Sequence, residues 1–172
     1  MIDQTSAAQE ISQLYARYAD AVWWHDYAAF GQCFAPDGEW RISGLELRGR
    51  AEITATIERI LARLRKVRIV VGTPILYFGD DGTASGRIHM TEHCAWKNGD
   101  TNISLGTYYD RYALVDGRWL FAWRLFAMDY RGPPDLTGTW LETPDYGPAP
   151  AMPPLDATTP DIATARWGVR DS

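Results

Sequence analysis

The sequence contains only two cysteines, Cys33 and Cys94, which are too few for a disulfide framework. No apolar run approaches the roughly 20 residues that a membrane-spanning helix needs, and the N-terminus lacks the basic, apolar and small-residue succession of a secretory signal. Positive charge is not in excess either, because the formal net charge is -5. These absences predict a cytoplasmic protein with free thiols that binds neither nucleic acid nor membranes.

Two common kinds of cofactor site are missing as well. The sequence has no G-x-G-x-x-G run after a strand and no phosphate-binding loop of the G-x-x-x-x-G-K-S/T type. His89 and His93 lie four residues apart on an expected strand, a span of roughly 13 Å, whereas each ligand of a metal ion lies about 2 Å from it. The sequence therefore predicts no cofactor and no metal site.

Aromatic side chains are what the sequence has in excess. It contains eight Trp and nine Tyr, and 46% of its 172 residues are hydrophobic. A chain of this length and composition fits one globular domain with a substantial core. Trp and Tyr combine a large apolar face with a polar tip, so they suit the wall of a pocket as well as a core.

Helical periodicity marks the N-terminal third of the chain. Ser6 and Gln9 fit a capping box, and a second helix is expected over 26–34, before a strand over 39–43. A third helix is expected over 53–64, with the basic run over 63–68 as its solvated end. The apolar residues of the first helix recur on one face: Ile11, Leu14, Tyr15, Tyr18, Val22 and Trp23.

The periodicity changes to two after residue 67. Four long β-type runs cover 68–78, 83–96, 102–115 and 118–129, and the turn pairs Asp81-Gly82, Asn98-Gly99 and Asp116-Gly117 separate them. Short turns between long strands predict an antiparallel meander, so the helices must cover one face of the sheet. We expect an α+β cone over residues 1–131. A Pro-rich arm over 132–172 would pack on this domain or on a partner subunit.

An ordered set of short motifs resembles the SnoaL-like family of the nuclear-transport-factor-like superfamily. The motifs are Phe34-Ala35-Pro36-Asp37, Gly49-Arg50, Gly72-Thr73-Pro74, Gly106-x-Tyr108-x-Asp110-x-Tyr112 and Gly117-x-Trp119 followed by Arg124. The resemblance covers roughly the first three quarters of the chain. It implies a cone-shaped fold such as that of scytalone dehydratase, bile-acid dehydratase and polyketide cyclases, which are cofactor-free acid-base enzymes. Other members of the superfamily bind ligands or assemble complexes, so membership implies a fold before a reaction.

Two positions depart from the catalytic pattern of the related dehydratases and the dehydrochlorinase. Those enzymes place an Asp late in the first helix and a His just before the Gly/Pro step of a strand. This sequence has Trp23 and Ile69 there. Neither an indole nor a sec-butyl group can accept a proton as imidazole does, so this Asp/His pair is absent.

Glu92 is the leading candidate for acid-base chemistry. If Met90 and Cys94 point into the cone, strand alternation points Glu92 the same way. The position also matches an active-site Asp of the bile-acid dehydratase that the chain resembles. A carboxyl in an apolar pocket has a raised pKa, which is useful at neutral pH. The alternative interpretation is a structural salt bridge between Glu92 and Arg124.

Arg124, Tyr18 and Tyr108 complete the candidate catalytic set. Arg124 shares the inner face of its strand and matches an active-site Arg of the dehydrochlorinase. Arg124 would bind a substrate oxygen or hold Glu92 ionised. The alternative is a purely structural ion pair of Arg124 with Asp110 or Glu92. The phenols of Tyr18 and Tyr108 would donate to a carbonyl or enolate oxygen, although Tyr108 also fits a simple wall position.

The remaining candidates are apolar wall positions that favour flat aromatic or polycyclic ligands. Cys94 has no evident base beside it, so we interpret it as a packing residue. Aromatic residues that simply fill a core are the alternative for the whole wall. The wall positions are Trp23, Trp40, Ile69, Met90, Cys94, Phe126 and Met128.

These features favour a cofactor-independent lyase, dehydratase or isomerase that acts on a hydrophobic cyclic or aromatic compound. Two alternatives stay open: a non-catalytic binding or assembly protein of the same fold, and the small subunit of a ring-hydroxylating oxygenase. Outward-facing residues and the Trp-containing arm predict a homodimer or a higher homo-oligomer.

Overall fold

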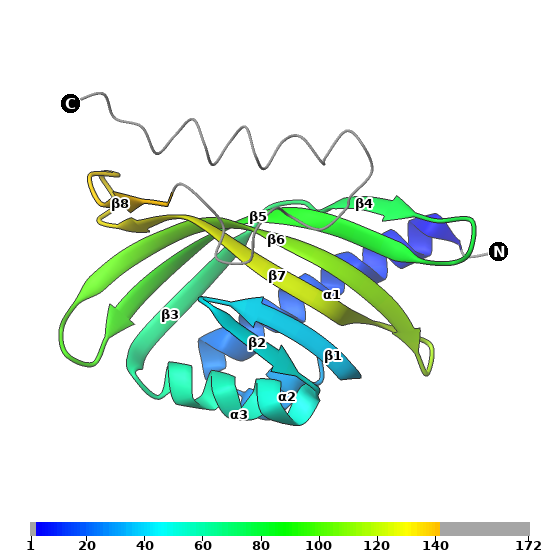
Figure 1. The fold of residues 1–172 in the computed structure, drawn as a ribbon, viewed down its shortest axis with the longest axis horizontal. Helices are drawn as coiled ribbons and strands as arrows, with labels where there is room; N and C mark the ends of the chain where they lie inside the picture. The colour runs from blue at the N-terminus through cyan, green and yellow to red at the C-terminus, as the bar shows by residue number, and fades with distance from the viewer. Residues whose placement is uncertain (1–2, 142–172) are drawn as a thin grey trace.

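The computed structural model describes residues 3–141, in which three helices lie against a curved sheet (Figure 1). Helix α1 (Gln4–Trp24) crosses the concave side of the sheet, and α2 (Tyr27–Gly31) and α3 (Arg50–Leu61) pack on each other. Asp3 caps α1 by accepting a hydrogen bond from the Thr5 amide at 3.1 Å. The capping box expected at Ser6 and Gln9 is therefore wrong, because the capping residue is Asp3, three positions earlier.

The sheet contains eight strands within the described residues and is mixed rather than purely antiparallel. The strands are β1 (Phe34–Ile42), β2 (Leu45–Arg48), β3 (Leu64–Val71), β4 (Ile75–Phe78), β5 (Ala84–Trp96), β6 (Thr101–Val115), β7 (Arg118–Gly132) and β8 (Thr139–Trp140). Their order is β2-β1-β7-β6-β5-β3, with β4 beside β5 and β8 beside β7. The expected α+β class is confirmed. The departure from the expected sheet is β1, which runs parallel to β7.

The basic run over 63–68 belongs mainly to β3 and not to a helix end. Helix α3 ends at Leu61, and β3 begins at Leu64. Because β3 is an edge strand, its charged side chains can face water without weakening the sheet. The strand expected over 68–78 is also two strands, since Gly72-Thr73-Pro74 separates β3 from β4.

Irregularities in strand pairing accompany the curvature of the sheet. The β6–β7 register shifts between Leu105 and Gly106 and again between Arg111 and Tyr112, and such bulges bend a strand. Gly106 is required at the first bend, because a Cβ there would lie 2.4 Å from Cε2 of Phe126. The missing side chain lets the Phe126 ring lie across the concave face.

A dense cluster of aromatic rings fills the space between the helices and the concave face. We call Tyr18, Phe30, Phe34, Trp40 and Phe121 the ring cluster; all five side chains are buried. Neighbouring ring centroids within it lie 4.8 to 6.4 Å apart. Part of the expected hydrophobic wall is therefore packed core.

The start of the expected Pro-rich arm folds back onto β7. The Tyr130 hydroxyl donates to the Pro133 carbonyl at 2.6 Å, and the Tyr130 and Trp140 ring centroids lie 4.7 Å apart. The rest of the arm, from residue 142, lies outside the described residues. No helix within residues 3–141 is both long enough and apolar enough to span a membrane.

Candidate functional site

Glu92 lies on the concave side of β5, beside the edge strand. It pairs with Ile69 of β3 on one side and with Ser104 of β6 on the other. Its neighbour His93 is exposed, whereas Cys94 is buried, as strand alternation requires. The side chain of Glu92 therefore lies on the same face as Cys94, and the residue is partly buried.

Burial raises the pKa of Glu92 above its usual value of 4.5. Hydrogen bonds from the side chains of Cys94 and Ser104, together with the positive charge of Arg131, oppose this rise without cancelling it. Glu92 forms no ion pair with any residue in the described part of the chain. Desolvation is therefore the largest influence on the proton affinity of Glu92.

Arg124 pairs with Asp110 rather than with Glu92. Its Nε donates to Asp110 Oδ1 at 2.7 Å and its Nη2 donates to Oδ2 at 3.0 Å, and neither side chain is exposed. Tyr15 adds a third donor to Asp110 at 2.5 Å. The interpretation of Glu92 as the salt-bridge partner of Arg124 is therefore wrong.

The Arg124 guanidinium lies beneath the two phenols of the candidate site. Its Cζ lies 4.4 Å from the ring centroid of Tyr18 and 3.9 Å from that of Tyr108. Burial lowers the pKa of Arg124, but the carboxylate of Asp110 outweighs burial and raises it, so the group stays charged. A fixed positive charge thus lies against the rings of Tyr18 and Tyr108.

The hydroxyl groups of Tyr18 and Tyr108 lie 3.1 Å apart and share one hydrogen bond. Burial raises the pKa of Tyr18 to about 12 and raises the pKa of Tyr108 well above its usual value. Both phenols are therefore protonated at neutral pH. One donates to the other, which leaves the second hydrogen for an acceptor in the same interior. The charge of Glu92 acts on the pKa of both, so the three groups share one neighbourhood.

The apolar wall positions fall into three groups. Trp40, Met90, Cys94 and Phe126 are buried, and Ile69 and Met128 are partly buried against the core. Trp23 differs, because it is 36% exposed at the end of α1 and Lys66 Nζ lies 4.8 Å from its ring centroid. Trp23 therefore lies at the surface, at the end of α1, and not among the buried wall positions.

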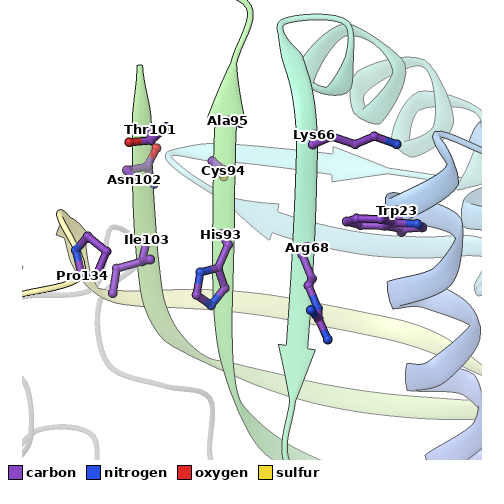
Figure 2. Close-up of a pocket in the computed structure, with 10 residues that line it drawn as sticks. All are labelled: Trp23, Lys66, Arg68, His93, Cys94, Ala95, Thr101, Asn102, Ile103 and Pro134. Atoms are coloured by element: carbon purple, nitrogen blue, oxygen red, sulfur yellow. The ribbon is translucent and has the colours of Figure 1, made fainter. Parts of the chain in front are cut away.

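A surface groove of about 310 Å³ extends from Trp23 across one end of the sheet (Figure 2). Its polar lining comes from Lys66 and Arg68 of β3, His93 of β5, and Thr101 and Asn102 of β6, and Cys94 borders it. In Figure 2 the side chains of Lys66 and Trp23 point toward each other. Because His93 alternates with Glu92 along β5, most of the groove belongs to the opposite face of the sheet. Of the predicted site residues, Trp23 and Cys94 line it.

Three residues that share the face of Glu92 were not predicted from the sequence: Trp96, Asn102 and Ser104. A signal for them existed, because Asn102 and Ser104 alternate with Gly106 and Tyr108 on β6. The Asn98-Gly99 turn also fixes which residues of β5 they face. Among residues 3–141, no three His, Cys, Asp or Glu side chains lie close enough together to hold a metal ion.

The fold and this interior define a class of proteins: α+β folds in which helices cover the concave face of a curved sheet around a buried aromatic cluster. The chain belongs to the family with a SnoaL-like domain, whose profile matches residues 3–124. No curated protein matches the chain at a significant level.

Solved structures share this fold at low sequence identity. Rv3472 of Mycobacterium tuberculosis, described as a protein of unknown function, is 26% identical with a TM-score of 0.67, and the match covers 74% of each chain. A putative scytalone dehydratase from Novosphingobium aromaticivorans is 17% identical, with a TM-score of 0.71 over 79% of this chain and 93% of that one. The hexachlorocyclohexane dehydrochlorinase LinA-type3 from Novosphingobium barchaimii is 18% identical, with a TM-score of 0.70 over 81% of this chain and 96% of that one.

Proposed function

We propose that this protein is a cofactor-independent enzyme that moves a proton on a flat, hydrophobic cyclic or aromatic compound, as a lyase or an isomerase. The observation that carries the proposal is Glu92, a partly buried carboxyl group with a raised pKa on the concave side of the sheet, where two protonated phenols also lie. The dehydratase and dehydrochlorinase among the structures of the same fold support this choice of chemistry.

The proposed reaction begins at a carbon next to a carbonyl group. The carboxylate of Glu92 takes a proton from this carbon, so the C–H bond breaks and an O–H bond forms on Glu92. The electron pair moves onto the carbonyl oxygen as an enolate, to which Tyr18 or Tyr108 donates a hydrogen bond. The proton then returns to a different carbon in an isomerase. In a dehydratase it joins a departing hydroxyl group to form water.

Arg124 has a supporting role in this proposal, because Asp110 already occupies its Nε and Nη2. Its charge stabilises the negative charge that develops near the phenols. Of the wall positions, Ile69, Met90, Phe126 and Met128 would contact the ring system of the substrate and Trp23 would lie at its exposed end, whereas Trp40 belongs to the packed ring cluster.

Deuterium exchange in D₂O tests the proposal without knowledge of the natural substrate. We expect the protein to accelerate exchange of the α-hydrogens of bicyclic ketones, led by 2-tetralone, above the buffer rate, as ¹H NMR would record. Heat-denatured protein is the control. Ketones that quench the tryptophan fluorescence on binding and yet exchange at the buffer rate would contradict the enzyme proposal.

A non-catalytic binding protein is the second candidate. The observation that favours it is that Trp23 and Ile69 replace the Asp and His of the related enzymes, so that Glu92 must act without an imidazole partner. A cytoplasmic location, a homo-oligomeric state and the division into 1–131 and 132–172 remain predictions from the sequence, as does the oxygenase-subunit alternative.

A further inference from the structure

A row of hydrogen bonds leads from the β5–β6 hairpin to Ser104, which lies opposite Glu92. Trp96 Nε1 donates to Asn102 Oδ1 at 2.7 Å, and Asn102 Nδ2 donates to Ser104 Oγ at 3.2 Å. Ser104 is the direct cross-strand partner of Glu92, so both side chains lie on the same face of the sheet, and the Ser104 hydroxyl lowers the pKa of the carboxyl group. We call Trp96, Asn102 and Ser104 the polar row.

The chemistry of the donors fixes the direction of the polar row. An indole N–H can only donate, so the amide atom of Asn102 that faces Trp96 must be its oxygen. The amide nitrogen then faces Ser104 and donates to its hydroxyl oxygen. With that acceptor position occupied, the hydroxyl hydrogen of Ser104 is free to point at Glu92. The indole N–H of Trp96 therefore determines, through the orientation of the Asn102 amide, whether the Ser104 hydroxyl hydrogen can point at Glu92.

Trp96 also places a positive charge near Glu92. The guanidinium of Arg131 lies 5.3 Å from the Trp96 ring centroid, and that of Arg63 lies 5.7 Å from it. Arg131 is an exposed side chain on β7, and contact with a ring restricts such a chain. Its charge acts on Glu92. Trp96 thus has two separable effects, one through its N–H and one through its ring.

We propose that Trp96 is a positioning residue for Glu92, which it orders through the polar row so that the Ser104 hydroxyl donates to the carboxylate. The inference rests on the proposed function for its catalytic meaning only. The row stabilises the ionised form of Glu92, which is the form that accepts a proton. It thereby limits how far desolvation raises the proton affinity of the base.

Other groups around Glu92 come from its own strand and from four other strands or helices, and none depends on the indole N–H. They are Cys94 of β5, Tyr108 of β6, Arg131 of β7, Tyr18 of α1 and the apolar Ile69 of β3. A change that removes the N–H and keeps a ring in place therefore isolates the polar row from these neighbours.

Trp96→Phe is that change, because the ring remains beside Arg131. Without the indole N–H, the Asn102 amide can turn and offer its oxygen to Ser104, whose hydrogen then leaves Glu92. We expect the titration midpoint of the Glu92 carboxyl carbon, followed by ¹³C NMR without substrate, to rise by about one pH unit. Ser104→Ala should give a similar rise. The double variant should add nothing to Ser104→Ala alone, because both changes remove one hydrogen bond.

Trp123→Phe is the matched control. Trp123 also contacts two guanidinium groups, those of Arg41 and Arg111, but it lies on the opposite face of β7 from Arg124. Its replacement should leave the Glu92 midpoint unchanged. Asn102→Ala breaks the same row without touching either indole, so it tests the proposal if Trp96→Phe fails to fold. The proposal is overturned if Trp96→Phe leaves the Glu92 titration midpoint unchanged. If that variant does not fold, an unchanged midpoint in Asn102→Ala overturns it.

The same variants give a kinetic signature when exchange activity is present. The pH midpoint of the exchange rate should move upward with the Glu92 titration, while the rate at high pH stays close to that of the unmodified protein. A lower rate at every pH with no movement of the midpoint would indicate a merely structural role and would contradict the proposal. The NMR titration needs no turnover, so its outcome is independent of whether the protein is an enzyme.

Discussion

Glu92→Gln is expected to lower the rate of deuterium exchange on a bound bicyclic ketone by a factor of about 10² to 10⁴, the usual contribution of a general base. The amide has nearly the same shape as the carboxylate and can still accept a hydrogen bond from Ser104. It cannot take a proton from carbon. Binding of the ketone, measured by quenching of tryptophan fluorescence, should change little because the apolar contacts remain.

Glu58→Gln is the control for this substitution, since Glu58 is an exposed residue of α3. It makes the same change in net charge far from the concave face, so exchange should remain at the unmodified rate. Full exchange activity in both Glu92→Gln and Glu58→Gln would show that Glu92 is not the base.

Asp110→Asn is expected to reduce the free energy of unfolding by about 3 to 5 kcal/mol, the cost of leaving a buried charge without its partner. Arg124 is fully buried, and Asp110 is its ion-pair partner. The amide would accept fewer of the three hydrogen bonds that Asp110 now receives from Arg124 and Tyr15. Urea denaturation followed by circular dichroism measures the loss directly.

Glu46→Gln provides the comparison with a surface ion pair. Glu46 is 47% exposed, and its contacts with Arg41 and Arg48 are 3.8 Å long, so the loss should stay below about 1 kcal/mol. Equal losses for Asp110→Asn and Glu46→Gln would contradict the role that we give to the buried pair.

The meander and the inward direction of Glu92 could be predicted because both follow from local patterns. Asp116 and Gly117 both adopt positive φ, as a tight hairpin turn requires. Alternation along 88–94 is likewise a property of one strand, and the structure has Met90 and Cys94 buried while His89 and His93 are exposed. Neither inference needs knowledge of a distant part of the chain.

The parallel pairing of β1 with β7 could not be predicted in the same way. Trp40 is the partner of Arg124 in that pairing, 84 positions along the sequence, and no local pattern in either strand specifies it. The partner of Arg124 was left open for the same reason, since both Glu92 and Asp110 alternate inward. Cross-strand register brings Asp110 directly opposite Arg124 and decides between them.

The position of Trp23 shows a different limit of sequence patterns. Helical periodicity placed Trp23 with Tyr18 on the buried face of α1, but the helix ends at Trp24 and His25 adopts a left-handed conformation. The last turn therefore has less sheet to cover, and Trp23 packs beside Lys66 at the rim. Periodicity predicts which face of a helix is apolar, but it does not predict how far along the helix the sheet covers that face.

The pH dependence of the exchange rate tests the central claim most directly. The carboxylate is the active form of Glu92, and burial raises its pKa above 4.5, so the rate corrected for buffer exchange should increase with pH through a midpoint above 4.5. The midpoint should coincide with the NMR titration of Glu92 in the same protein. A corrected rate that does not change with pH, or a Glu92 carboxyl that titrates at or below 4.5, would contradict proton transfer by a desolvated Glu92.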